Sequence, residues 1–144
     1  MRIALVVSTY HSFVTERLEA GARAVLRDAG VADGDVETFA VPGAYELAQA
    51  AGLIADTQAW SAVVCIGCLI RGETPHFQVI ADAAANGIIR AAQTSNVPIT
   101  FGVLTTNTVE EALARAGEGA SNKGREAASA AVDMARLYAR VRQP

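Results

Sequence analysis

The stretch "GCLIRGETPHF", residues 67–77, joins an apolar run to a cluster of hydrogen-bonding residues that includes His76, one of two histidines in the sequence. Thr is a favoured helix N-cap and Pro a favoured first helical residue, so Thr74 and Pro75 predict a helix start with His76 in its first turn. The backbone N–H groups of Glu73 and Thr74 at such a start suit a phosphate, and an imidazole exchanges protons near neutral pH. The stretch therefore predicts a phosphate site beside a general acid–base. The alternative is a plain helix cap with a solvent-facing histidine.

A second candidate is "VPGAYE", residues 41–46. Its Pro-Gly pair predicts a tight bend after a strand. The amides of Ala44 and Tyr45 could then contact the polar edges of a ligand, and the Glu46 carboxylate could accept hydrogen bonds from hydroxyls. The alternative is a simple strand-to-helix turn.

Two further segments carry aromatic and basic side chains. In "STYHS", residues 8–12, Tyr10 could stack on a flat heterocycle, with His11 beside it. The alternative is an exposed turn with Ser12 as a helix cap. In "RAGEGASNKG", residues 115–124, Arg115 and Lys123 flank a glycine-rich joint and could bind phosphate, Arg in bidentate fashion and Lys as a point charge. The alternative is a solvated joint.

The elements that must position these residues alternate along the chain. Apolar runs rich in β-branched residues predict strands at 2–8, 35–41, 60–70 and 97–105. Helical periodicity predicts helices at 12–30, 42–58, 74–95, 108–117 and 121–141, the fourth with a capping box from Thr108 to Glu111. The alternation predicts an α/β fold, a flavodoxin-like three-layer sandwich with a four-stranded parallel sheet and helices on both faces. Ligands bind at the carboxyl ends of such strands, where "STYHS", "AVPGAYE", "GCLIRGETPHF" and "FGVLTTNT" are expected.

Composition excludes several classes of function. The 144 residues predict one domain, residues 1–144, and the net charge of −3 provides no basic surface for nucleic acid. The longest uncharged apolar run, "AVVCIGCLI", is too short to span a bilayer, and "MRIALVV" does not resemble a signal peptide. We therefore expect a cytoplasmic protein with no membrane partner.

The only two cysteines, Cys65 and Cys68, form a C-x-x-C pattern. The pattern lies within an apolar strand and not at a helix start, which favours two small core residues. The alternative is a redox pair of the thioredoxin type.

Together and in this order, the segments "VPGAYE", "GCLIRGETPHF", "PITFGVLTTNT", "RAG" and "NKG" resemble the 6,7-dimethyl-8-ribityllumazine synthase family, over nearly the whole chain. The family acts in riboflavin biosynthesis. It condenses 5-amino-6-ribitylamino-pyrimidinedione with 3,4-dihydroxy-2-butanone 4-phosphate and releases phosphate and water. The resemblance implies a transferase that needs no metal ion and no organic cofactor.

The resemblance also implies a role for each matching residue. His76 is the catalytic acid–base, and Glu73, Thr74 and Arg115 bind the phosphate. Phe101, Arg115 and Lys123 belong to the neighbouring subunit of a homopentamer. The pyrimidine and its ribityl chain are bound by Tyr10, His11, Ala44, Tyr45, Glu46, Cys68, Leu69, Ile70, Phe101 and Lys123.

The sequence departs from the family at three places. Tyr10-His11 stands where Phe-Asn is common, and Gln78 stands where an acidic residue often follows the catalytic histidine. The sequence starts directly at the first expected strand, which favours a free pentamer or a pentamer pair over a larger shell. A functional link to riboflavin synthase is expected. The alternatives are a catalytically weak paralogue that binds lumazine or flavin or forms a structural assembly, and a flavodoxin-like binding module of another kind.

Overall fold

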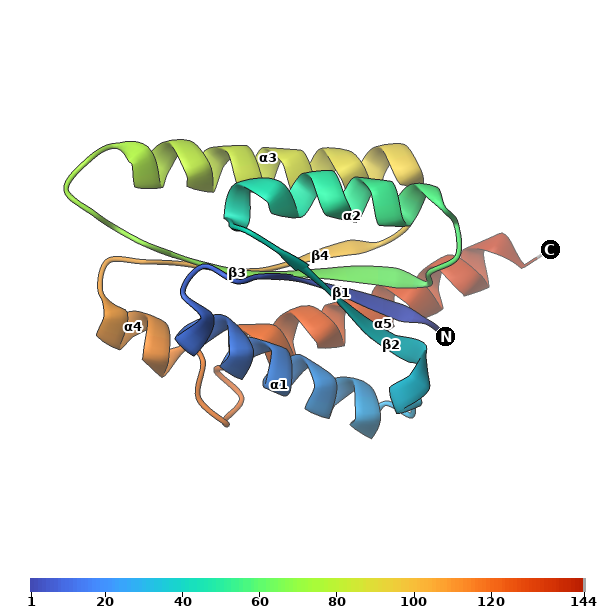
Figure 1. The fold of residues 1–144 in the computed structure, drawn as a ribbon. Helices are drawn as coiled ribbons and strands as arrows, with labels where there is room; N and C mark the ends of the chain where they lie inside the picture. Colours follow the sequence, from blue (N-terminus) through green and yellow to red (C-terminus); the bar gives the residue numbers. More distant parts are fainter. Residues whose placement is uncertain (144) are drawn as a thin grey trace.

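Four parallel strands form the centre of the computed structural model, which describes residues 1–143 (Figure 1). The strands are β1 (Ile3–Ser8), β2 (Val36–Val41), β3 (Ala62–Ile70) and β4 (Ile99–Thr106), and they lie in the order β2-β1-β3-β4. Every residue of β1 is buried, because its neighbours cover both edges and helices cover both faces. This explains why its first five residues, Ile3 to Val7, are all apolar and do not alternate with polar ones.

Helices form a layer on each face of the sheet, so the predicted three-layer α/β fold is confirmed. One layer contains α1 (Ser12–Asp28), α4 (Val109–Ala114) and α5 (Lys123–Arg142), and the other contains α2 (Leu47–Asp56) and α3 (His76–Ser95). Short 3₁₀ turns, η1 (Asp33–Asp35) and η2 (Ala44–Glu46), precede β2 and α2. Within residues 1–143, no helix is long and apolar enough to cross a membrane.

Two helix starts differ from the sequence prediction. The helix expected from residue 42 begins only at Leu47, because Gly43 is extended and the next three residues form a 3₁₀ turn closed by the Glu46 N–H on the Gly43 carbonyl oxygen at 3.2 Å. The N-cap of α3 is Pro75 and not Thr74, since the Pro75 carbonyl oxygen accepts the first helical bond, from Val79 N–H at 3.2 Å. Thr74 instead accepts from the His76 N–H through its hydroxyl at 3.4 Å.

One of the two hydrogen bonds of the predicted capping box at α4 is present. The Thr108 hydroxyl accepts from the Glu111 N–H at 3.1 Å, as expected for an N-cap. The Glu111 carboxylate, however, accepts from the N–H of Asn107 at 2.8 Å, one residue before the cap. The β4–α4 turn is therefore tied to the first turn of α4 at two points.

The N-terminus of α5 packs directly against the backbone of α1. A Cβ placed on Gly124 would overlap the carbonyl oxygen of Leu18. Leu18 is fully buried, and Gly124 is buried in the same contact. Only glycine allows the two helices to approach this closely, and the contact fixes where the segment between α4 and α5 returns to the core.

Replacing Gly124 by Ala should destabilise the protein by about 1–3 kcal/mol or more, since the added methyl group must push α5 away from α1. Urea unfolding monitored by circular dichroism would measure the change. Gly34→Ala is the matched control, because a Cβ there meets nothing within 4 Å. Equal unfolding midpoints for the two variants would contradict the close-approach argument.

Candidate functional site

Two separate hollows lie at the carboxyl edge of the sheet. The first, which we call the His76 hollow, has a volume of about 680 Å³ and is lined by residues that follow β1 and β2, the end of β3, the start of α3 and Val109. The second, the Arg115 hollow, has a volume of about 560 Å³ and is lined by β4, α4, Arg115 and Lys123. No residue lines both hollows.

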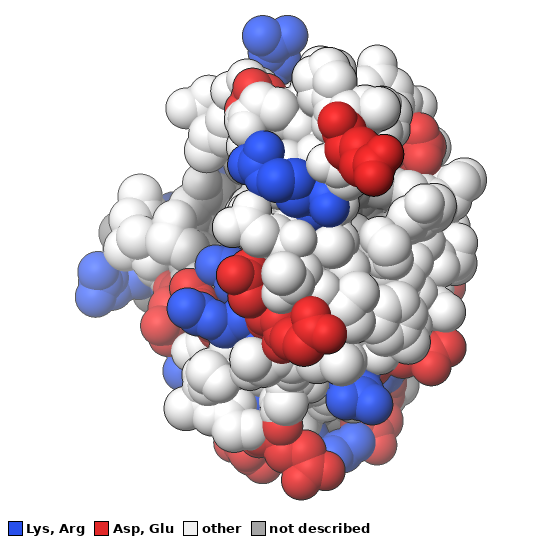
Figure 2. Space-filling view, turned by 90° about the vertical axis from the view of Figure 1, so that its left-hand side faces the viewer, with Lys and Arg blue, Asp and Glu red and all other residues white. Residues whose placement is uncertain are grey.

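Figure 2 shows this end of the molecule in space-filling form. Lys and Arg groups are interspersed with Asp and Glu groups, and uncharged surface lies between them. No broad patch of one sign covers this face in the view shown. The binding of an anion must therefore depend on individual cations and backbone N–H groups.

The His76 hollow brings together most of the residues predicted from the sequence. They come from segments that are far apart in the chain and meet because all parallel strands end at the same edge. The predicted residues that line it are Tyr10, His11, Ala44, Tyr45, Glu46, Cys68, Leu69, Ile70, Thr74 and His76.

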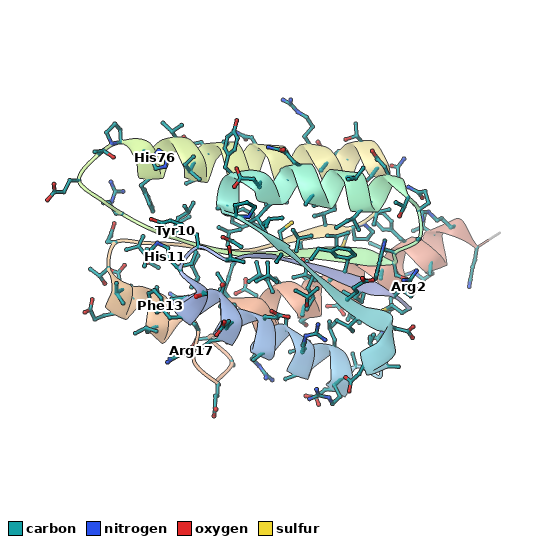
Figure 3. The ribbon with its side chains drawn as sticks, viewed as in Figure 1. Arg2, Tyr10, His11, Phe13, Arg17 and His76 are labelled. Carbon is teal, nitrogen blue, oxygen red and sulfur yellow. The ribbon has the colours of Figure 1, made fainter. Side chains whose placement is uncertain are left out.

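The turn after β1 presents Tyr10 and His11 to the hollow (Figure 3). His11, not Ser12, is the N-cap of α1, and its backbone is left-handed with φ 56° and ψ 47°. His tolerates this conformation better than most residues with a side chain. The His11 ring packs edge-to-face on Tyr10 at a centroid distance of 4.5 Å, and partial burial lowers the pKa of its imidazole. Tyr10 itself is 64% exposed, so one face of its ring is open to a ligand.

The 3₁₀ turn η2 forms a second wall of the His76 hollow. Ala44 is buried against α2 and the sheet, while the Tyr45 side chain is 53% exposed. The backbone bends at this point before α2 begins, so the turn residues line the hollow, while Leu47, Ala51 and Ala55 of α2 are buried in the core.

The loop between β3 and α3 provides free hydrogen-bond donors. Within residues 1–143, the backbone N–H groups of Gly72, Glu73 and Thr74 donate to no protein acceptor. They lie just before the N-terminus of α3, a helix of 20 residues. His76, the first residue of α3, is exposed at the same place. Glu73 lines neither hollow, although its N–H group belongs to this donor cluster.

The Arg115 hollow contains the three remaining predicted residues, Phe101, Arg115 and Lys123. The backbone carbonyl of Arg115 accepts from the Lys123 N–H at 2.9 Å, so the joint between α4 and α5 is closed at its two ends. The Lys123 ammonium also pairs with the Glu126 carboxylate at 3.2 Å, an i,i+3 pair with Glu126 largely exposed. Such a pair is weak and leaves Lys123 able to contact a ligand.

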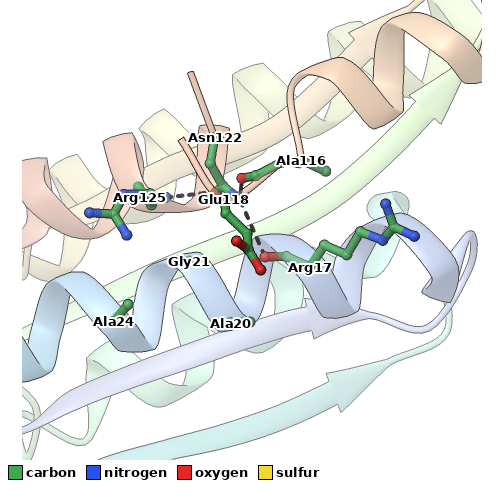
Figure 4. Close-up of a pocket in the computed structure, with 9 residues that line it drawn as sticks. Arg17, Ala20, Gly21, Ala24, Ala116, Glu118, Asn122 and Arg125 are labelled. Atoms are coloured by element: carbon green, nitrogen blue, oxygen red, sulfur yellow. Dashed lines mark hydrogen bonds between the residues drawn. The ribbon is translucent and has the colours of Figure 1, made fainter. Parts of the chain in front are cut away.

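Asn122 fixes this joint to α1 (Figure 4). Its side chain is 1% exposed, donates to the carbonyls of Gly117 at 2.8 Å and Arg17 at 3.3 Å, and accepts from the Arg125 N–H at 3.0 Å. The last bond caps α5. A single buried amide thus sets both the start of α5 and the path of the glycine-rich loop.

Sequence reasoning missed several residues that line the hollows. Phe77 and Ile80 add apolar surface from α3, and Val109 adds more from the start of α4. Ile80 lies one turn after His76, so its helical spacing was a usable signal. Glu111, which lines the Arg115 hollow four residues before Arg115, could have been found in the same way. Val109 gave no signal, because only the tertiary structure brings it near.

The cysteines are core residues, as the favoured interpretation predicted. Cys65 packs in the cluster under α2 and α3, whereas Cys68 packs in the cluster under α1 and α5. The two side chains therefore lie on opposite faces of the sheet, and both thiols are free. Burial raises the pKa of Cys65 to about 12 and that of Cys68 to about 11, the reverse of what a redox pair needs.

Comparison with known proteins points to one family. The family model described as 6,7-dimethyl-8-ribityllumazine synthase matches residues 1–139. A curated protein of Chlorobium phaeovibrioides (strain DSM 265 / 1930), named 6,7-dimethyl-8-ribityllumazine synthase, is 46% identical over 137 residues. The matched region covers 95% of this chain and 88% of the relative.

Both thiols should resist a thiol reagent in the folded protein at about pH 8 and react fully in urea. Unfolding returns each pKa to 9.0, so the folded state holds its thiol protons more tightly. The thiols should therefore not change the free energy of unfolding below pH 9, and they should lower it as the pH rises from about 9 toward 12. Cys65→Ala should reduce that fall. Fast labelling of the native protein, or a disulfide between the two residues, would contradict the core assignment.

Proposed function

The chain belongs to the 6,7-dimethyl-8-ribityllumazine synthase family, and we propose that its active site forms where the His76 hollow of one copy meets the Arg115 hollow of the next. The protein is a transferase of riboflavin biosynthesis. It condenses 5-amino-6-ribitylamino-pyrimidinedione with 3,4-dihydroxy-2-butanone 4-phosphate and releases phosphate and water. Neither comparison supports the alternative of a catalytically weak paralogue.

The division of the candidate residues between two hollows carries the proposal of a shared site. His76 and the open face of Tyr10 belong to one hollow, while Arg115 and Lys123 belong to the other, at the β4 edge. One copy alone thus presents each half to solvent. If two different faces of the same chain meet, the contact is head-to-tail, and its repetition forms a ring when the rotation between copies closes. The family resemblance implies a closed ring of five subunits, and we therefore propose a homopentamer.

Within the His76 hollow, the exposed ring of Tyr10 stacks on the pyrimidine. The η2 turn, residues 44–46, binds the ring edge and the ribityl hydroxyls through backbone groups and the Glu46 carboxylate. The end of β3, residues 68–70, lines the heterocycle pocket with backbone groups. These assignments agree with the exposure of Tyr10 and with the bend that turns η2 toward the hollow.

The phosphate of the second substrate binds between the two hollows. The free N–H groups of Glu73 and Thr74 donate to it at the positive end of α3, and Arg115 of the neighbouring copy provides a bidentate cation. Lys123 and Phe101 of that copy complete the pocket. Because the phosphate is a leaving group in this reaction, the same donors stabilise its negative charge as it departs.

His76 exchanges protons in several steps of the reaction. One amine of the pyrimidine adds to the ketone and forms a Schiff base with loss of water. Phosphate is then eliminated, and the second amine closes the ring with loss of a second water. Each step moves a proton, and one imidazole at the mouth of the hollow can accept and return it. The greater part of the rate enhancement then comes from holding the two substrates together.

The assembly has further support from exposed apolar side chains on α2 and α3. Leu53 is 73% exposed, Val79 61% and Ile89 55%. Apolar groups exposed on neighbouring helices suit contact with other copies of the chain. Three further points stay predictions: a free pentamer or a pentamer pair, a functional link to riboflavin synthase, and a cytoplasmic location.

Incubation with both substrates should produce lumazine fluorescence, and His76→Ala should lower turnover by about 10²-fold or less. Substrate affinity should change little, because the imidazole acts on protons and not on binding. Gln78→Ala is the matched control, since Gln78 lies in the same turn but binds Asp82 and lines no hollow. Absence of product from the parent protein would refute the activity, and unchanged turnover in His76→Ala would remove His76 from the mechanism.

Site sharing can be tested by mixing two impaired variants. His76→Ala and Arg115→Ala rings each lack one half of every site, and co-refolding in equal amounts should restore roughly a quarter of the interfaces. Activity is compared with each variant refolded alone, and light scattering checks the ring mass. No regain in verified mixed rings would place the whole site within one chain.

A further inference from the structure

The side chain of Arg71 connects three segments at the mouth of the His76 hollow. Its Nε donates to Oδ1 of Asn107 at 2.9 Å, and its guanidinium lies over the Phe77 ring at 4.9 Å. Its backbone N–H donates to the Thr106 carbonyl at 2.8 Å, which extends the β3–β4 pairing by one residue. The Arg71 guanidinium thus contacts both the β4–α4 turn and the first turn of α3.

The loop that Arg71 spans has few other ties. Residues 72–75 are exposed, and among the described residues the only other side-chain bond of the loop is the long one from His76 N–H to Thr74 at 3.4 Å. The backbone N–H groups of residues 72–74 find no acceptor in the part of the chain that the structure describes. A loop with so few contacts samples many conformations unless a side chain restrains it.

The far anchor of the contact is itself rigid. The Asn107 N–H donates to the Glu111 carboxylate at 2.8 Å, and the adjacent Thr108 caps α4. Asn107 therefore keeps a fixed orientation relative to α4. On the near side, Phe77 follows His76 directly and lines the hollow.

We propose that Arg71 is a positioning residue that, through Asn107 and Phe77, holds the loop N–H groups and His76 in the geometry that the reaction requires. The inference rests on the proposed function for the roles of His76 and of residues 73–74. The planar guanidinium is essential, because it must donate to an amide oxygen in one direction and stack on a ring with its face. A lysine ammonium keeps the charge but not this shape.

The competing role for Arg71 is direct contact with the substrate phosphate. The ion pairs found within residues 1–143 involve Arg23, Arg27 and Lys123, so the Arg71 charge has no carboxylate partner there. The two roles differ in what they require. A direct charge contact tolerates Arg71→Lys and does not depend on Asn107, whereas the positioning role fails in Arg71→Lys and in Asn107→Ala alike.

The activity test compares Arg71→Ala, Arg71→Lys, Asn107→Ala and the Arg71→Ala/Asn107→Ala double variant. Misplaced catalytic groups cost up to about 10²-fold, so we expect kcat/KM to fall by about 5- to 100-fold in each. The loss should lie in kcat and in the KM of the butanone phosphate, with the KM of the pyrimidine within about twofold of the parent. The double variant should be no worse than either single, since both remove the same contact.

Arg142→Ala is the matched control. Its guanidinium also lies over a ring, that of Tyr138 at 5.2 Å, and donates to the Asn96 carbonyl, at the opposite end of the sheet. This variant should keep parent activity. Parent-like activity in Arg71→Lys, or additive losses in the double variant, would overturn the positioning role.

A second measurement does not depend on the enzyme reaction. Without substrates, hydrogen exchange of the segment 71–78 should become faster in Arg71→Ala and in Asn107→Ala and stay unchanged in Arg142→Ala. If the parent makes no lumazine but these rates rise, the proposed function fails and the restraint on the loop stands. Unchanged exchange in both site variants would overturn the inference even if activity fell, as would faster exchange with full activity.

Discussion

The burial of β1 and β3 on both faces is the constraint on which the rest of the structure depends. A strand covered by helices on two faces and by strands on two edges has no place for an unpaired polar group, so its residues must be apolar. Cys65 and Cys68 show the consequence, because residues that look reactive in the sequence are packed into two separate parts of the core. Along β1 and β3, polar side chains appear only at the strand ends, and parallel pairing brings the carboxyl ends of all four strands to one edge.

A second constraint on the structure is the close contact between α1 and α5. Gly124 lets the helices meet at the backbone, and the buried amide of Asn122 fastens the glycine-rich loop to α1. The loop would otherwise have little to hold it. Arg115 and Lys123 therefore lie beside β4 at the two ends of a joint that is tied to α1.

The two hollows differ in the contacts that hold their walls in place. The Arg115 hollow is lined by β4 and by a joint that the buried side chain of Asn122 holds in place. The β3–α3 loop beside His76 is held by exposed contacts of Arg71. Surface contacts of this kind contribute little to global stability. They can nonetheless set the geometry of a reactive group, and a loop restrained in this way can still open for two substrates to enter and for phosphate to leave.

The sequence by itself determined the layer architecture, because strand burial and helix amphipathicity are local patterns with fixed periods. It also identified the polar segments, since Glu46 and His76 follow the ends of two apolar runs and Arg115 begins a glycine-rich joint between two helices. It did not determine the starts of α2 and α3, where bends at Gly43 and Pro75 compete with N-cap preference. Only the tertiary structure decided that Val109 lines the His76 hollow, that Arg71 reaches Asn107, and that the candidate residues divide between two hollows. Those are contacts between segments far apart in the chain, and no local pattern encodes the distance between them.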